Sequence, residues 1–210
     1  MSTVVCSHGF GVRADGRGMF TELQTAFPEH AFVMFDYNQV LKNGDLVVAP
    51  IDQQVVRLEK VLSSHSDAVL LAHSQGCIVA SMANMSHVKK VVLLAPPVEM
   101  SMQRVIDKLS RKPGATIDLE GVSKLPRRDG TTTQITHEYI QSVNNVNPSS
   151  LYANLAQKLP VTIIRATNDD VLGLTNFNEV PEACRIDLDA DHDFQDVART
   201  LLINALRPLL

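Results

Sequence analysis

The sequence predicts an α/β protein built on a doubly wound, mainly parallel sheet of about six strands. Two observations lead to this prediction. Short, nearly continuous apolar runs recur along the chain, as is typical of strands that are buried on both faces of a parallel sheet. Segments with helical spacing of their apolar residues lie between these runs, and such alternation favours a sheet with right-handed crossover helices.

Six segments have the composition of buried strands. They are residues 3–8 (TVVCSH), 30–37 (HAFVMFDY), 67–73 (DAVLLAH), 89–97 (KKVVLLAPP), 159–167 (LPVTIIRAT) and, with a weaker pattern, 183–190 (ACRIDLDA). Four further segments carry apolar residues three or four positions apart, which places those residues on one face of a helix. These residues are Met19, Leu23 and Phe27; Ile51, Val55, Leu58 and Leu62; Ile78, Met82 and Met85; and Phe194, Val197, Leu201 and Ala205.

One interval, at about residues 98–158, interrupts the alternation. It contains no repeat and no flexible linker, so residues 1–210 are predicted to form a single domain that carries this interval as an insertion. Insertions at the carboxyl ends of parallel strands commonly build ligand sites. Within the insertion we expect a helix at residues 100–109, extended segments at 114–121 and 122–136 with a turn at Asp129-Gly130, and short helices at 136–143 and 147–157.

The composition suits a globular domain with a large core, since 45% of the 210 residues are hydrophobic and 20% are charged. A formal net charge of −4 gives no attraction to nucleic acid or to anionic membranes, and no apolar run is long enough to span a bilayer. The first residues lack the pattern of a signal peptide. Cys6, Cys77 and Cys184 are expected to be buried free thiols in a reducing compartment, the cytoplasm. We expect a monomer or a homodimer, with no nucleic-acid partner and no stable membrane insertion.

Ser74 lies where a predicted strand passes into a predicted helix, within LLAHSQGCIV at residues 70–79. One interpretation is a helix N-cap, because serine is among the best residues for that position. The other is a nucleophile on a sharp strand-to-helix turn, which requires small residues two positions before and after it. Ala72 and Gly76 meet this requirement.

The A-H-S-Q-G pattern around Ser74 resembles the nucleophile elbow of the α/β-hydrolase superfamily, and SHGFG at residues 7–11 resembles the oxyanion loop of its lipases and esterases. The resemblance implies that the backbone amides of Phe10 and Gln75 form the oxyanion hole. It also implies a minimal α/β-hydrolase fold similar to small single-domain esterases, without the two antiparallel strands that usually come first and with the insertion as a lid.

The remaining members of the catalytic triad follow in the order that the superfamily uses, an acid and then a histidine. Ala166-Thr167-Asn168-Asp169 is similar to the family pattern G-x-x-D, which makes Asp169 the expected acid and Asp170 the near alternative. Both acids could instead be ordinary turn residues. His192 lies between the last predicted strand and the last helix, where the triad histidine is expected.

A metal site is the rival interpretation of the region around His192. Its acids alternate as in hard-cation loops, but the glycine and closing glutamate of an EF-hand loop are missing. The residues concerned are Asp189, Asp191, His192 and Asp193. The resemblance to hydrolases implies neither a metal nor an organic cofactor. His8 and His73, next to the two glycine-containing motifs, are expected to be structural.

Several residues of the insertion could line a substrate pocket, although such residues are more often part of a core. They are Met100, Met102, Tyr139 and Tyr152. Arg127 and Arg128 could meet an acidic group of a substrate or lie on a solvated hairpin tip.

The sequence therefore predicts a serine hydrolase that cleaves carboxylic esters of small or medium acyl groups. Ser74 would attack the carbonyl carbon, His192 would take the serine proton, and Asp169 would orient the imidazole. The small-molecule acyl substrate could also be a thioester or a peptide, because both pass through the same oxyanion. A ligand-binding or regulatory protein that keeps the fold without turnover is the alternative from another class.

Overall fold

Six parallel strands form the main sheet of the computed structural model, which describes residues 2–100, 106, 110, 113–127, 129–144, 146–178, 180 and 184–210. The strand order is β10-β9-β6-β5-β1-β2. The strands are β1 (Thr3–Ser7), β2 (Ala31–Met34), β5 (Ala68–His73), β6 (Val88–Leu94), β9 (Val161–Ala166) and β10 (Arg185–Leu188). Each lies within or overlaps one of the predicted apolar runs, and the predicted fold class is confirmed.

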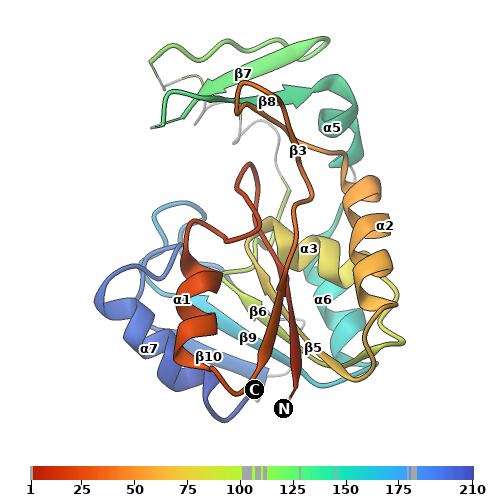
Figure 1. The fold of residues 1–210 in the computed structure, drawn as a ribbon, viewed down its shortest axis with the longest axis vertical. Coiled ribbons are helices and arrows are strands. Elements are labelled where there is room, and N and C mark those ends of the chain that lie inside the picture. Colours follow the sequence, from red (N-terminus) through yellow and green to blue (C-terminus); the bar gives the residue numbers. More distant parts are fainter. Residues whose placement is uncertain are drawn as a thin grey trace.

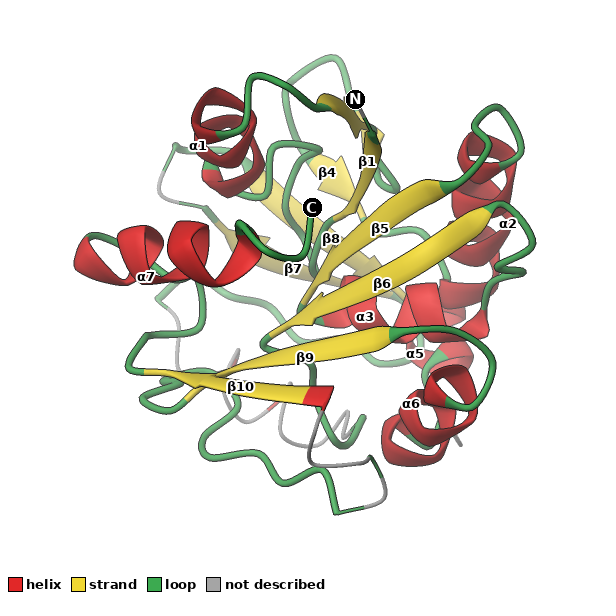
Figure 2. Ribbon diagram, turned by 90° about the horizontal axis from the view of Figure 1, so that it is seen from below, coloured by secondary structure: helices red, strands yellow, loops and turns green. Residues whose placement is uncertain are grey.

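Helices cover both faces of this sheet (Figure 2). One face is covered by α1 (Met19–Ala26) and α7 (Val197–Leu206). The other is covered by α2 (Ile51–Leu62), α3 (Gln75–Met82) and α6 (Pro148–Ala156). In β5, Val69 and Leu71 pack on the face covered by α1 and α7, whereas Leu70 and Ala72 pack on the face covered by α2, α3 and α6. Burial on both faces accounts for the continuous apolar runs in the sequence.

A second, smaller sheet lies beyond the carboxyl ends of the main strands (Figure 1). Its order is β3-β4-β8-β7, with β4 and β8 parallel and the two outer pairs antiparallel. The strands are β3 (Gln39–Val40), β4 (Leu46–Val47), β7 (Val122–Pro126) and β8 (Thr132–Thr136). The sequence analysis did not predict the β3–β4 hairpin, although Asn43-Gly44 is a turn signal and Gly44 has a φ of 88°.

The insertion contains most of the elements expected of it. The hairpin β7–β8 turns at Asp129-Gly130, while the earlier segment contributes an isolated bridge between Thr116 and Lys124. Two short helices follow, α5 (His137–Ser142) and α6, and the Asn147 side chain caps α6 by accepting from the amide of Ser150. Most of the helix expected at 100–109 lies outside the described residues.

Two of the three cysteines have the expected environment. Cys6 and Cys77 are free and buried, and Cys184 is free but partly exposed, because it lies at the beginning of the edge strand β10. No helix in the described part of the chain is both long and apolar enough to cross a membrane.

Candidate active site

Ser74 occupies a strained turn between β5 and α3. Its φ of 54° and ψ of −126° lie in a region that non-glycine residues seldom adopt. Ser74 is the N-cap residue of α3, yet its side chain makes no capping hydrogen bond. The hydroxyl is therefore not used to start the helix, which argues against capping as the reason for a serine here.

Close packing against the end of β1 explains the small residues around Ser74. A Cβ atom on Gly76 would lie 2.3 Å from the carbonyl oxygen of Ser7 and 2.7 Å from that of His8. A Cβ atom on Gly9 would lie 3.1 Å from the Cβ atom of Ser74. Any larger residue at position 76 would push the two segments apart, so Gly76 is what allows the loop after β1 to lie against Ser74.

Three side chains from the carboxyl ends of β5, β9 and β10 form a hydrogen-bonded chain. His192 Nε2 lies 2.9 Å from Ser74 Oγ, and His192 Nδ1 lies 2.7 Å from Asp169 Oδ2. The side chains of His192 and Asp169 are only 7% and 3% exposed. The structure thus brings together the three residues that the sequence analysis singled out, and it selects Asp169 over the exposed Asp170.

The environment of Asp169 determines how the protons are arranged. Burial alone would raise the pKa of this carboxyl group, but its hydrogen bond to His192 and the charge of that ring lower the pKa below its ordinary value, as do the amides of Leu172 and Val171. These amides donate to Oδ1 at 2.6 and 2.8 Å. An ionised carboxylate only accepts, so Nδ1 of His192 carries the proton and Nε2 can accept from the hydroxyl of Ser74.

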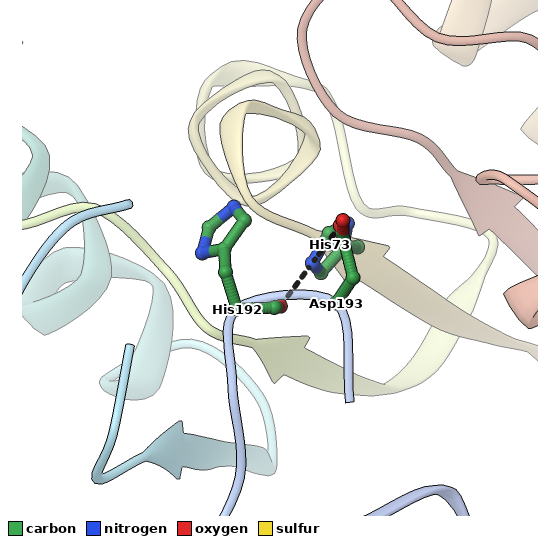
Figure 3. Close-up of side chains that lie close together, drawn as sticks. All are labelled: His73, His192 and Asp193. Carbon is green, nitrogen blue, oxygen red and sulfur yellow. Dashed lines mark hydrogen bonds and ion pairs between the residues drawn. The ribbon is translucent and has the colours of Figure 1, made fainter. Parts of the chain in front are cut away.

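His8 and His73 both bond to the backbone. His8 bonds to the carbonyl of Gly9 through Nδ1 and accepts from the amide of Tyr37 through Nε2. His73 Nε2 lies 2.9 Å from the backbone oxygen of His192 (Figure 3). Burial, followed by the nearby charge of His192, lowers the pKa of His73, which keeps the ring neutral and able to hold the His192 loop in place.

The acids around His192 do not converge on a cation site. Asp193 forms an ion pair with Arg17 at 2.6 Å, Asp191 accepts from the amide of Gln195, and Asp189 bonds to the side chain of Asn168. Among the described residues, the only group of three or more His, Cys, Asp or Glu side chains with ligand atoms within 4.8 Å of one another is His73, His192 and Asp193. Figure 3 shows the His192 imidazole turned away from Asp193, and both of its nitrogens are already engaged with Ser74 and Asp169. This geometry does not support the metal interpretation.

Phe10 and Gln75 belong to the two segments that meet at the Ser74 turn. Gln75 is the first residue of α3, where amides lack partners within the helix and the helix dipole is positive. Phe10 follows Gly9, which contacts Ser74. Within the described part of the chain, neither amide donates a hydrogen bond to another protein group. Both amides are therefore unpaired donors within the described residues.

The second sheet is bound to the loop that contains Phe10. Arg127 of the β7–β8 hairpin donates from one guanidinium nitrogen to the carbonyl oxygen of Gly11 at 2.6 Å. Gly11 has a φ of 60°, and a Cβ atom there would lie 3.2 Å from the methyl group of Thr133 in β8. Arg127 is therefore partly buried against this loop and does not lie on a solvated hairpin tip. Arg128 and Met102 lie outside the described residues.

Gln54 was missed as a residue that contacts the site, and Tyr139, considered only as a possible pocket wall, contacts it through Gln75. Tyr139 donates its hydroxyl to Gln75 Oε1, and Gln75 Nε2 donates to Gln54 Oε1. No local sequence pattern marks these partners, although a polar Gln54 on the otherwise apolar face of α2 is a signal that could have been noticed. Tyr152 instead packs in the core and donates to the carbonyl of Pro97, and Met100 packs beside the same core.

A hollow of about 530 Å³ lies at the far end of α3, away from Ser74. Residues between α3 and β6 and residues of α6 line it, among them Asn84, Met85, Asn154 and Lys158. Its lining includes none of Ser74, Asp169, His192, Phe10 and Gln75, so it is separate from the Ser74 site.

Comparison with solved structures gives many proteins of the same fold at low sequence identity. Est1E from Butyrivibrio proteoclasticus, with ferulic acid bound, is 14% identical over 100% of this chain and 88% of that chain, with a TM-score of 0.67. A pyrethroid hydrolase from Sphingobium faniae is 14% identical over 99% and 96% of the two chains, with a TM-score of 0.67. A putative non-heme bromoperoxidase from Mycobacterium tuberculosis is 15% identical over 99% and 91%, with a TM-score of 0.66.

No curated protein sequence matches the chain significantly. A family model does match it, over residues 4–202, and that model describes the alpha/beta hydrolase family. The match covers the six strands of the main sheet, except Thr3 of β1, and the segments that carry Ser74, Asp169 and His192. The chain belongs to the alpha/beta hydrolase family.

Proposed function

We propose that this chain is a serine hydrolase that cleaves carboxylic esters of small or medium acyl groups. The observation that carries the proposal is the continuous hydrogen-bonded chain from Ser74 Oγ through His192 to the buried carboxylate of Asp169. Such a chain supplies a nucleophile, a general base within reach of it, and a group that orients the base.

The proposed reaction has two halves. Ser74 Oγ forms a bond to the acyl carbon while its proton passes to His192 Nε2, and the carbonyl electron pair moves onto the oxygen. The amides of Phe10 and Gln75 stabilise that oxyanion. When the intermediate collapses, the alcohol leaves with the proton from His192. A water molecule then gives a proton to His192 Nε2 while its oxygen bonds to the acyl carbon. The bond from that carbon to Ser74 Oγ breaks, His192 returns the proton to Oγ, and the acid is released.

We also propose that the protein works in the cytoplasm, on a small-molecule substrate. All three cysteines are free, and free thiols are typical of reducing compartments. The reaction as proposed uses only side chains and backbone amides of this chain.

The test is hydrolysis of p-nitrophenyl acetate, butyrate and octanoate by the wild type, Ser74→Ala and Ser81→Ala. Ser81 lies on the same helix and donates to the carbonyl of Cys77 at 2.8 Å, so it is a matched serine away from His192. We expect Ser74→Ala to lower kcat by about 10⁴-fold or more with little change in stability, because a member of the triad is removed. Ser81→Ala should retain activity. Equal activity of Ser74→Ala and wild type would refute the proposal.

The same assay separates the alternatives. A thioesterase would show a higher kcat/KM for an acyl-coenzyme A thioester than for the p-nitrophenyl esters, and a peptidase a higher value for a peptide p-nitroanilide. A folded protein that binds short-chain esters without turning them over would be a ligand-binding member of the family.

A further inference from the structure

Tyr139 contacts both residues whose amides are proposed to form the oxyanion hole. Its hydroxyl donates to Gln75 Oε1 at 2.5 Å. Its ring lies against the ring of Phe10, with centroids 5.4 Å apart and planes inclined at 44°. Phe10 follows β1 and Gln75 begins α3, so this tyrosine of the insertion is a direct link between the two segments that flank Ser74.

The side chain of Gln75 is fixed at both ends. Its Nε2 donates to Gln54 Oε1 at 3.1 Å, and Gln54 Nε2 in turn donates to the carbonyl of Ala49 at 2.6 Å. These two hydrogen bonds orient the side-chain amide group of Gln75 so that Oε1 faces Tyr139. Burial raises the pKa of the Tyr139 phenol, so the hydroxyl keeps its proton and donates it. The whole row is buried and satisfied, which leaves it few alternative arrangements.

Tyr139 itself is held by its own helix. Its amide donates to Thr136 Oγ1 at 3.4 Å, and its carbonyl accepts from Ser142 Oγ at 2.7 Å. The same Ser142 Oγ accepts from the amide of Ile51, the first residue of α2. Ser142 thus links helix α5 to the beginning of α2, and Tyr139 is bonded at both its amide and its carbonyl.

We propose that Tyr139 is a positioning residue for the oxyanion hole. Its hydroxyl limits rotation of Gln75 at the beginning of α3, and its ring limits movement of Phe10, so that both amides face one point beside Ser74 Oγ. Donors that are already in place stabilise the developing charge without having to reorganise. This inference rests on the proposed function.

The experiment compares Tyr139→Phe with Tyr152→Phe. Tyr139→Phe keeps the ring beside Phe10 and removes only the hydroxyl. Tyr152 is a matched control, since it is also a buried tyrosine of the insertion and its hydroxyl donates to a backbone oxygen, that of Pro97, at 2.9 Å. Two quantities are measured, steady-state hydrolysis of p-nitrophenyl butyrate and inhibition by 1,1,1-trifluorooctan-2-one. Addition of Ser74 Oγ to this ketone, with the proton passing to His192, forms a hemiketal oxyanion.

We expect Tyr139→Phe to lower kcat about tenfold while KM changes less than about twofold. Displacing an oxyanion-hole donor should reduce kcat by only part of the factor that removing the donor would. The Ki of the ketone should rise by about the same factor as kcat falls. Tyr152→Phe should leave kcat and the Ki of the ketone within about twofold of the wild-type values, even if it lowers the melting temperature as much as Tyr139→Phe does. Equal kinetics in the two variants would overturn the inference.

A double-mutant cycle tests whether the hydroxyl acts through Gln75. Gln75→Leu keeps the backbone amide and removes the acceptor, so adding Tyr139→Phe to it should cause no further loss of kcat. Full additivity would contradict the inference. If Tyr139→Phe does not fold, Gln54→Met is used in its place, because it removes the other side-chain hydrogen bond to Gln75. It should likewise lower kcat while KM changes less than about twofold. A wild type without esterase activity would refute the proposed function, whereas an active wild type with unaffected variants would refute only the role of Tyr139.

Discussion

The backbone of Ser74 is strained, and the residues packed around the turn hold it in that conformation. A serine at a φ of 54° costs on the order of 1–3 kcal/mol, and such strain persists only where the surrounding structure requires it. Here Gly76 and Gly9 allow the end of β1 to press against the turn. The turn leaves Oγ free of the helix and within hydrogen-bonding distance of His192.

Asp169→Asn should lower kcat by about 10³- to 10⁴-fold with KM little changed, because the asparagine amide can donate to Nδ1 and favours the tautomer that protonates Nε2. That tautomer cannot accept the proton of Ser74. The measurement is hydrolysis of p-nitrophenyl butyrate near pH 7.

Asp170→Asn is the control for this substitution. Asp170 follows Asp169 directly in the chain and is exposed. Its conversion to asparagine should change kcat by less than about twofold, as is usual for exposed residues away from the reacting groups. The assignment would be wrong if Asp170→Asn were the inactive variant.

At the residue level, position in the chain predicted more than residue type. Ser74, Asp169 and His192 each follow a strand, and the carboxyl ends of parallel strands share one edge of the sheet, so their proximity could be expected. The choice between Asp169 and Asp170 could not be made from the sequence, because both follow the same strand. In the structure His192 bonds to Asp169 Oδ2, and the amides of Val171 and Leu172 donate to Asp169 Oδ1, which selects Asp169.

At the level of elements, long buried strands were predictable and short polar ones were not. The six main strands have four to seven residues each, and β1, β5, β6 and β9 are mostly buried, whereas β3 and β4 have two residues each. The insertion was expected as a lid. It supplies β7 and β8 of the second sheet, which contact the loop after β1 through Arg127 and Thr133.

Arg127→Met should weaken the attachment of the second sheet to the loop after β1, because it removes the hydrogen bond from Arg127 to Gly11. The carbonyl of Gly11 loses a charged donor, so the free energy of unfolding should fall by about 1–2 kcal/mol, and kcat/KM should fall about tenfold as the loop that carries Phe10 shifts. Urea unfolding and p-nitrophenyl butyrate hydrolysis measure the two effects.

Lys124→Met on the same hairpin is the matched control, because Lys124 is exposed on β7. It should leave stability and kcat/KM nearly unchanged. If Arg127→Met behaved like Lys124→Met in both measurements, the second sheet would have no influence on the oxyanion loop.

At the level of the whole molecule, the site exists only when distant segments are packed together. Residues after β5, β9 and β10 supply the hydrogen-bonded chain, and the loop after β1 and helix α5 surround it. The polar row from Tyr139 through Gln75 to Gln54 could not be predicted from the sequence, because packing of three separate helices decides which buried polar groups meet.

The central claim is that Ser74 is a nucleophile activated by the fold. The most direct test is reaction of the native protein with a fluorophosphonate, followed by tandem mass spectrometry of the tryptic peptide 61–89, which contains Ser74 together with several other serines. We predict a single phosphonyl adduct on Ser74 and none after unfolding in urea, since the unfolded chain lacks the contact with His192. An adduct on another residue, or no adduct in the native protein, would contradict this account.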